Sequence, residues 1–192
     1  MHISPLIIPF FREKCNAFQH HPALFAIAYG RGDRMNKLTP HDWKSLAVFE
    51  GITLGSGGLV AFLTRKSMAF YDTVARPSFA PPGWLFPVAW TVLYAAMAFA
   101  AWMIWRERPA NIKALLTLYF LQLLVNCLWP VVFFTLEALG LAFVWLILLW
   151  ALVLATMIGF FRTKKAAGWL LVPYQAWLTF AAVLNFTVAK MN

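Results

Sequence analysis

Five long runs of apolar residues dominate the chain after residue 44, and shorter polar segments separate them. The runs cover residues 45–63, 84–105, 114–134, 138–161 and 166–189. Each run has about the 20 residues with which an α-helix crosses a hydrocarbon core of about 30 Å. The pattern therefore predicts an all-α integral membrane protein, with a bundle of five transmembrane helices in one domain of residues 45–192.

Two segments lie outside the runs. Residues 1–44 lack an apolar run of spanning length and contain all four histidines, so we expect a polar N-terminal tail. A short polar leader joins Met35 to the first run, and we hypothesise that translation begins at Met35. Residues 64–83 form a long connection that is rich in proline, which predicts a lid over one mouth of the bundle.

Composition and charge agree with a membrane protein. Of 192 residues, 62% are apolar and 12% are charged, which excludes a soluble domain and a disordered chain. The net charge of +9 comes from basic residues between the runs, so we expect contact with anionic membrane lipids and no nucleic-acid partner. More of these residues lie on the side of the N-terminus, which predicts a cytoplasmic N-terminus and a C-terminus outside.

Residues for conventional acid–base or metal chemistry are scarce in the runs. All histidines lie in the tail, and Glu50 is the one acidic residue inside a run, which argues against a hydrolase or transferase site. The runs contain no imidazole for axial ligation of haem iron. We interpret Cys127 as a small apolar core residue, and we expect no metal site and no required cofactor.

Small residues in the first run predict close helix packing. Gly51 and Gly55 are four residues apart, the spacing at which two membrane helices approach closely through their backbones. The neighbour can be another helix of this chain or a second copy. We favour packing over ligand contact at these glycines.

The third run places two amides on one face. Gln122, Asn126, Trp129 and Phe133 follow helical spacing. Polar amides do not face lipid, so the two amides either bridge helices or line a cavity. Both alternatives stay open at this point.

The fifth run shows a similar spacing. Tyr174, Trp177 and Ala181 follow one another toward Asn185. Pro173 precedes them and removes one backbone hydrogen-bond donor. This position is a candidate for a functional kink.

The ten tryptophans divide by depth. Those at the ends of the runs are typical of an interfacial belt: Trp43, Trp84, Trp105 and Trp169. The deeper ones need a partner other than lipid for the indole N–H, so some must face inward: Trp90, Trp102, Trp129, Trp145, Trp150 and Trp177. A cavity lined by aromatic faces and a few amides suits a planar apolar ring system with polar edges, such as a tetrapyrrole or a sterol.

Three motifs in order carry a resemblance to a known family. They read RPSFAPPGW at 76–84 with WTVLY at 90–94, QLLVNCLWP at 122–130, and PYQAW at 173–177. Residues 45–192 thereby resemble the TspO or translocator protein family, also called tryptophan-rich sensory proteins or peripheral-type benzodiazepine receptors. Phe79 stands where this family usually has Trp.

The resemblance implies a five-helix membrane protein, often a homodimer, that binds protoporphyrin IX and haem. By position it implies that Trp84, Asn126 and Trp177 line the ligand cavity. It also implies five neighbours in the cavity: Phe86, Trp90, Gln122, Trp129 and Phe133. We expect a sensor, carrier or scavenger of tetrapyrroles. The alternatives are a light-dependent porphyrin-degrading enzyme, with Trp84 and Trp177 as catalytic candidates, and a small membrane transporter.

Overall fold

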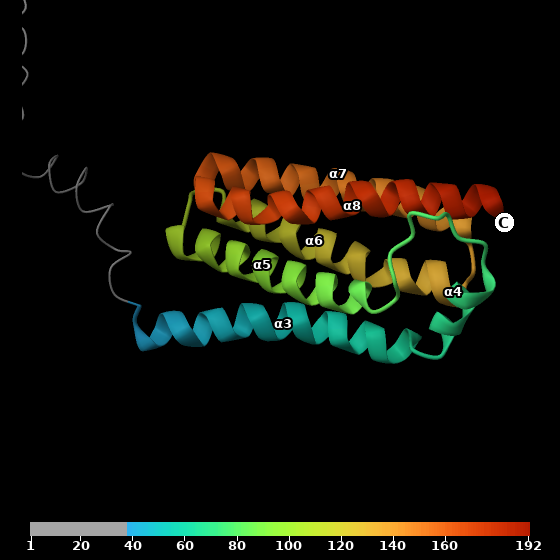
Figure 1. Ribbon diagram of the computed structural model, residues 1–192. Coiled ribbons are helices and arrows are strands. Elements are labelled where there is room, and N and C mark those ends of the chain that lie inside the picture. Colours follow the sequence, from blue (N-terminus) through green and yellow to red (C-terminus); the bar gives the residue numbers. More distant parts are fainter. Residues whose placement is uncertain (1–37) are drawn as a thin grey trace, which may run out of the picture. The chain divides into compact units, whose positions relative to one another are not determined.

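The structure is a computed structural model that describes residues 38–192. Five long helices make up most of these residues. All five are long and apolar enough to cross a membrane, which confirms the predicted all-α architecture (Figure 1). They are α3 (Pro40–Thr64), α5 (Leu85–Glu107), α6 (Ile112–Pro130), α7 (Leu139–Thr163) and α8 (Lys165–Met191). The hypothesis about Met35 and most of the predicted tail lie outside the described residues.

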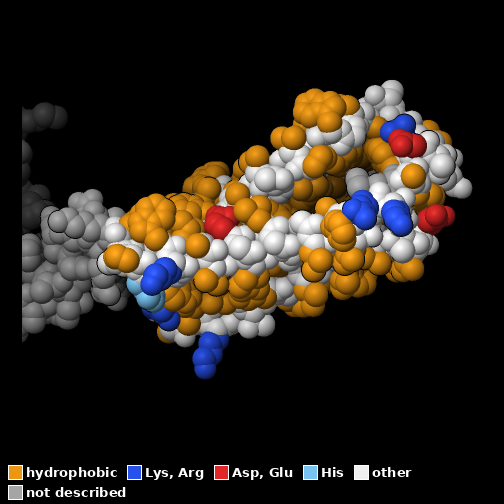
Figure 2. Space-filling model, turned by 90° about the horizontal axis from the view of Figure 1, so that it is seen from below, with side chains coloured by type: hydrophobic (Ala, Val, Ile, Leu, Met, Phe, Trp, Pro, Cys, Tyr) orange, Lys and Arg blue, Asp and Glu red, His pale blue; other side chains and the backbone are white. Residues whose placement is uncertain are grey.

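The outer surface of the bundle fits a lipid environment. Apolar side chains cover most of the face seen in Figure 2, and Lys and Arg side chains gather toward its two ends. Large apolar residues are also exposed on the outward sides of three helices, among them Val92, Leu124, Val144 and Leu148. In water such a surface would be unfavourable, whereas in a bilayer it meets acyl chains.

The first helix begins earlier than the apolar run predicts. Pro40 is the first residue of α3, and Asp42 lies in its first turn. Proline fits the first turn of a helix because its missing N–H would have no helical partner there. A carboxylate near the helix N-terminus interacts favourably with the helix dipole. Local chemistry at the helix start therefore extends α3 beyond the apolar residues.

Proline also shapes the end of the third span. Pro130 closes α6, and the next residues form the π-helical segment η3 (Val131–Thr135). The N–H of Leu136 donates to the carbonyl of Val131, five residues back, at 2.9 Å. Because proline cannot donate a backbone hydrogen bond, the helix changes its pairing at this point. Pro173, by contrast, lies inside α8, which continues without interruption.

The core lies among α5, α6, α7 and α8. Its fully buried side chains come from all four helices and include Met97, Ile104, Tyr119, Leu146, Leu149, Phe160, Leu171 and Tyr174. Since lipid tails are as apolar as these side chains, close packing and internal hydrogen bonds, more than removal from water, hold such a bundle together.

Helix α3 runs along the outside of the other four helices (Figure 1). Only Phe49, Thr53 and Thr64 of its residues are buried. The hydroxyls of Thr53 and Tyr119 are hydrogen-bonded at 2.6 Å and join α3 to α6. This helix is therefore attached by a few specific contacts and not by a broad packed surface.

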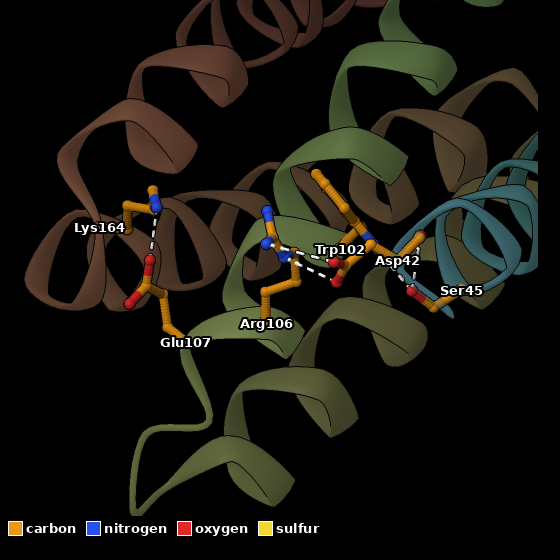
Figure 3. A network of polar contacts seen from close by, with 6 residues as sticks. All are labelled: Asp42, Ser45, Trp102, Arg106, Glu107 and Lys164. Atoms are coloured by element: carbon orange, nitrogen blue, oxygen red, sulfur yellow. Dashed lines mark hydrogen bonds and ion pairs between the residues drawn. The ribbon is translucent and has the colours of Figure 1, made fainter. Parts of the chain in front are cut away.

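Polar contacts fasten the first turns of α3 to the end of α5 (Figure 3). The Arg106 Nε lies 3.0 Å from the Asp42 Oδ1. The indole N–H of Trp102 donates to the Ser45 hydroxyl at 3.0 Å. The two charged side chains are largely buried, so the ion pair is less screened than a surface pair. These contacts close the bundle at the end opposite the predicted lid.

Among residues 38–192, no neighbour fulfils the predicted packing role of Gly51 and Gly55. No atom lies within 4 Å of a Cβ added at either position, because both glycines face outward. A contact with a second copy stays a prediction. The close approach instead occurs at Gly57, where an added Cβ would overlap the ring of Tyr94. The close neighbour of α3 at this glycine is therefore a side-chain ring of α5, whereas the sequence pattern predicted the close approach of two helix backbones.

The lid contains two short helices, η2 (Ser67–Ala69) and α4 (Phe70–Thr73). Val74 follows them and is buried in one apolar cluster with Leu184 and Val188 of α8. The Ala75 N–H donates to the Asn192 Oδ1 at 2.9 Å, and the Asn192 Nδ2 donates to the Ala75 carbonyl at 3.2 Å. The lid is thus docked on the C-terminal end of α8.

Replacing Gly57 by alanine tests the contact between α3 and Tyr94. We expect Gly57→Ala to lower the free energy of unfolding by about 1–3 kcal/mol, because the new methyl group overlaps a buried ring. Gly58→Ala is the matched control, since no atom lies within 4 Å of its added Cβ. Thermal unfolding in detergent measures both variants. Equal melting temperatures for the two variants would contradict the contact.

Replacing Asn192 by alanine tests the docking of the lid. Asn192→Ala removes both hydrogen bonds to Ala75, so we expect the Ala75 amide hydrogen to exchange about 5-fold faster. Hydrogen exchange followed by mass spectrometry measures the rate. Thr187→Ala, on an exposed hydroxyl of the same helix, should leave it unchanged. An unchanged rate in Asn192→Ala would show that apolar contacts alone hold the lid.

Candidate functional site

An aromatic cluster joins α5 to α8 near the lid. The ring centroids of Phe86 and Trp177 are 6.1 Å apart, and those of Trp90 and Trp177 are 6.4 Å apart. Trp90 also lies 6.1 Å from the ring of Tyr174. The rings meet at steep angles of 71° to 86°, the edge-to-face arrangement that aromatic quadrupoles favour. Three predicted site residues, from two helices, are therefore together.

Tyr71 of the lid connects this cluster to a second aromatic group. Its ring centroid is 5.8 Å from Phe86 and 6.5 Å from Phe134. Phe134 in turn contacts Trp129, whose ring stacks on Phe133 at 5.1 Å. The sequence pattern predicted a lid here but did not identify Tyr71 and Phe134 as members of the site. The sequence signal for Tyr71 was its position beside Phe70, just before the proline-rich motif at 76–84.

The two amides of α6 bridge helices. The Asn126 Nδ2 donates to the Tyr174 hydroxyl at 2.9 Å, and that hydroxyl donates to the Gln122 Oε1 at 3.2 Å. The Gln122 Nε2 lies 3.5 Å from the sulfur of Met97 on α5. Of the two alternatives left open for these amides, the structure favours helix bridging. Both amides use polar atoms within the protein, and the ligand-lining role that the resemblance implies for Asn126 and Gln122 stays a prediction.

Most deep tryptophans face the interior, as the need of the indole N–H for a partner predicts. Trp129 donates to the Ala142 carbonyl at 3.1 Å, and Trp145 donates to the Val125 carbonyl at 2.8 Å. Trp177 differs from these two. Its Nε1 is buried and has no hydrogen-bond partner within residues 38–192.

Unpartnered polar atoms are concentrated in the lid half of the bundle. The Trp177 Nε1, the Tyr71 hydroxyl and both amide atoms of Asn185 are buried without a partner among the described residues. Glu50 and Gln175 each hold one further such oxygen. A buried polar atom without a partner costs about 1–3 kcal/mol. A bound molecule with a polar edge could give these atoms the hydrogen bonds that they lack in the described chain.

The Tyr71 hydroxyl is suited to donate a hydrogen bond. Burial raises the pKa of this phenol above its ordinary value, although the nearby Arg76 opposes the shift. The guanidinium of Arg76 lies 4.8 Å from the centre of the Tyr71 ring. At neutral pH the hydroxyl keeps its proton.

Trp84 stands apart from the other predicted site residues. It precedes α5 and is 66% exposed. Within the described part of the chain its ring makes no contact with another aromatic ring. The structure therefore groups Phe86, Trp90 and Trp177 and leaves Trp84 at the surface. Trp129 and Phe133 are linked to this group through Phe134 and Tyr71.

Comparison with known proteins agrees with this architecture. A sequence model of the TspO/MBR family matches residues 49–191. The chain belongs to the TspO/MBR family. A tryptophan-rich protein TspO of Chlorobaculum tepidum is 35% identical over 77% of this chain and 96% of its own. The protein CrtK of Rhodobacter capsulatus is 41% identical over 65% of this chain and 79% of its own. Human translocator protein is 34% identical over 68% of this chain and 79% of its own.

Removing the Tyr174 hydroxyl tests the bridging network of this TspO/MBR protein. Tyr174→Phe leaves polar atoms of Asn126 and Gln122 without that partner in the core. We expect the free energy of unfolding to fall by about 1–3 kcal/mol. Tyr71→Phe is the matched control, because its hydroxyl has no partner among the described residues. Thermal unfolding of the two variants in the same detergent measures the difference, and an unchanged stability of Tyr174→Phe would refute the bridging role.

Proposed function

We propose that this protein binds a tetrapyrrole, protoporphyrin IX or haem, against the aromatic cluster of Phe86, Trp90 and Trp177 beneath the lid. The observation that carries the proposal is the meeting of α5, α8 and the lid in aromatic rings, with a buried indole N–H that has no partner in the described chain. In this function the protein acts as a sensor, carrier or scavenger in its membrane.

The chemistry of the cluster supports a flat ligand. Aromatic faces stack on planar ring systems, and each such contact contributes about 1–3 kcal/mol by analogy with base stacking. The five spanning runs contain no histidine. Haem would therefore be held by the faces and edges of its ring and not by an axial imidazole.

The names of the relatives support a role as a sensor or carrier. The relatives include a tryptophan-rich sensory protein and several translocator proteins. The first name describes a sensory protein, and the second describes a translocator. We extend this to the present chain as part of the proposal.

A titration with protoporphyrin IX tests the proposal. We expect saturable quenching of tryptophan fluorescence by the wild-type protein in nanodiscs, and an increase of Kd of about 10-fold in Trp177→Ala and in Phe86→Ala, because each variant removes a stacking surface. Trp43→Ala, which removes an exposed indole on α3, is the control. Trp84→Ala should have a smaller effect than Trp177→Ala. The proposal fails if wild-type protein shows no saturable binding.

Two further measurements separate binding from the alternatives. Illumination of the complex should leave the porphyrin absorbance as it is in a buffer control. A new absorbing species that disappears in Trp177→Phe would instead favour photochemical degradation. Gradient-driven uptake of the porphyrin into proteoliposomes would favour a transporter.

A further inference from the structure

Asn185 is a buried amide that lacks a hydrogen-bond partner in the described part of the chain. Its side chain is 3% exposed, and neither Oδ1 nor Nδ2 has a hydrogen-bond partner among residues 38–192. The residues that precede and follow it on the inner side of α8, Leu184 and Val188, belong to an apolar cluster with Phe133 and Ala142. An amide in such surroundings loses its contacts with water and gains none from the protein.

The position of Asn185 relates it to the aromatic cluster. Trp177, Ala181 and Asn185 are each four residues apart in α8, so they follow one side of the helix over about 12 Å. The indole N–H of Trp177 is also buried without a partner among the described residues. Ala181 between them is half-buried and has no side chain beyond Cβ. A flat molecule against Trp177 that extends along α8 would bring its edge to Asn185.

We propose that Asn185 recognises a neutral carboxylic acid group, or a group with the same donor and acceptor pattern, on the edge of the bound ligand. The inference rests on the proposed function. The Asn185 Nδ2 would donate to the carbonyl oxygen of the acid, and the acid O–H would donate to the Asn185 Oδ1. Both unpartnered atoms are then satisfied by one planar group.

Two related ligand groups fit the Asn185 amide less well. A carboxylate satisfies only the Nδ2 and carries its charge into an apolar region, which is costly. A methyl ester accepts from the Nδ2 but cannot donate to the Oδ1, which stays unpaired. A primary amide donates and accepts as the neutral acid does. Asn185 therefore distinguishes acid and amide from ester.

Three porphyrins test this selectivity: protoporphyrin IX, its dimethyl ester and its diamide. For the wild-type protein in nanodiscs at or below about pH 4, where much of the propionic acid is protonated, we expect similar Kd values for acid and diamide. We expect a Kd about 10-fold higher for the ester, because a site that hydrogen-bonds its ligand discriminates against an analogue that leaves a buried polar atom unpaired. In Asn185→Leu the three Kd values should converge to within about 2-fold. Thr187→Val is the control, because this hydroxyl of the same helix is exposed and donates to the Val183 carbonyl. It should keep the wild-type order.

The outcomes separate this inference from the proposed function. If the acid binds but the ester binds equally well, or if Asn185→Leu keeps the penalty for the ester, the role of Asn185 is wrong and porphyrin binding stands. A diamide that binds as weakly as the ester would show recognition of a carboxylate by charge and would also overturn the inference. If none of the three porphyrins binds, both proposals fail.

Stability of the ligand-free protein distinguishes recognition from a structural role. Because Asn185 has no partner in the described chain, Asn185→Leu should melt at the wild-type temperature or above it. A large loss of stability would show that the amide supports the fold, and that result contradicts the inference. Asn185→Ala, which keeps the backbone and adds no bulk, repeats the porphyrin comparison if the leucine does not fit.

Discussion

The Tyr174 hydroxyl is the contact on which the interior of this bundle depends. In a bilayer a polar side chain inside the helix bundle must find its hydrogen bonds within the protein, because neither lipid nor bulk water offers them. Tyr174 meets this requirement for two amides of α6 at once, and it is fully buried. The hydroxyl thereby links α6 to α8 inside the bundle, and the Tyr174 ring also contacts Trp90 of the aromatic cluster.

The two ends of the bundle are built differently. At the end that holds the start of α3, charged and polar groups pair across helices: Asp42 with Arg106, and Glu107 with Lys164 (Figure 3). Toward the lid, buried polar atoms of Trp177 and Asn185 lack partners in the described chain. The paired end stabilises the fold, whereas the lid end keeps the unsatisfied groups that a ligand can use. The lid is docked on this end, where Val74 and the Ala75 backbone contact α8 and the Tyr71 ring contacts Phe86 and Phe134.

Proline contributes to the site through the backbone. Pro130 converts the end of the third span into the π-helical η3, which presents Phe133 and Phe134 near the lid. A regular helix through the same residues would turn these rings in other directions, since each added residue per turn changes the angle between successive side chains. Pro173 has no comparable effect, because α8 continues through it. Proline thus ends the α-helix at position 130 but is accommodated within the helix at position 173.

Sequence by itself determined the five spans, the inward face of Gln122 and Asn126, and the inward direction of most deep tryptophans, because length and periodicity are local properties and lipid excludes polar groups everywhere along a span. Tertiary structure decided the rest. It assigned the α6 amides to Tyr174, moved the close glycine contact from Gly51 and Gly55 to Gly57, left Trp84 exposed and brought Tyr71 and Phe134 into the site. Each of these depends on which residue of a distant helix lies opposite, and helical spacing specifies a face but not the partner that meets it.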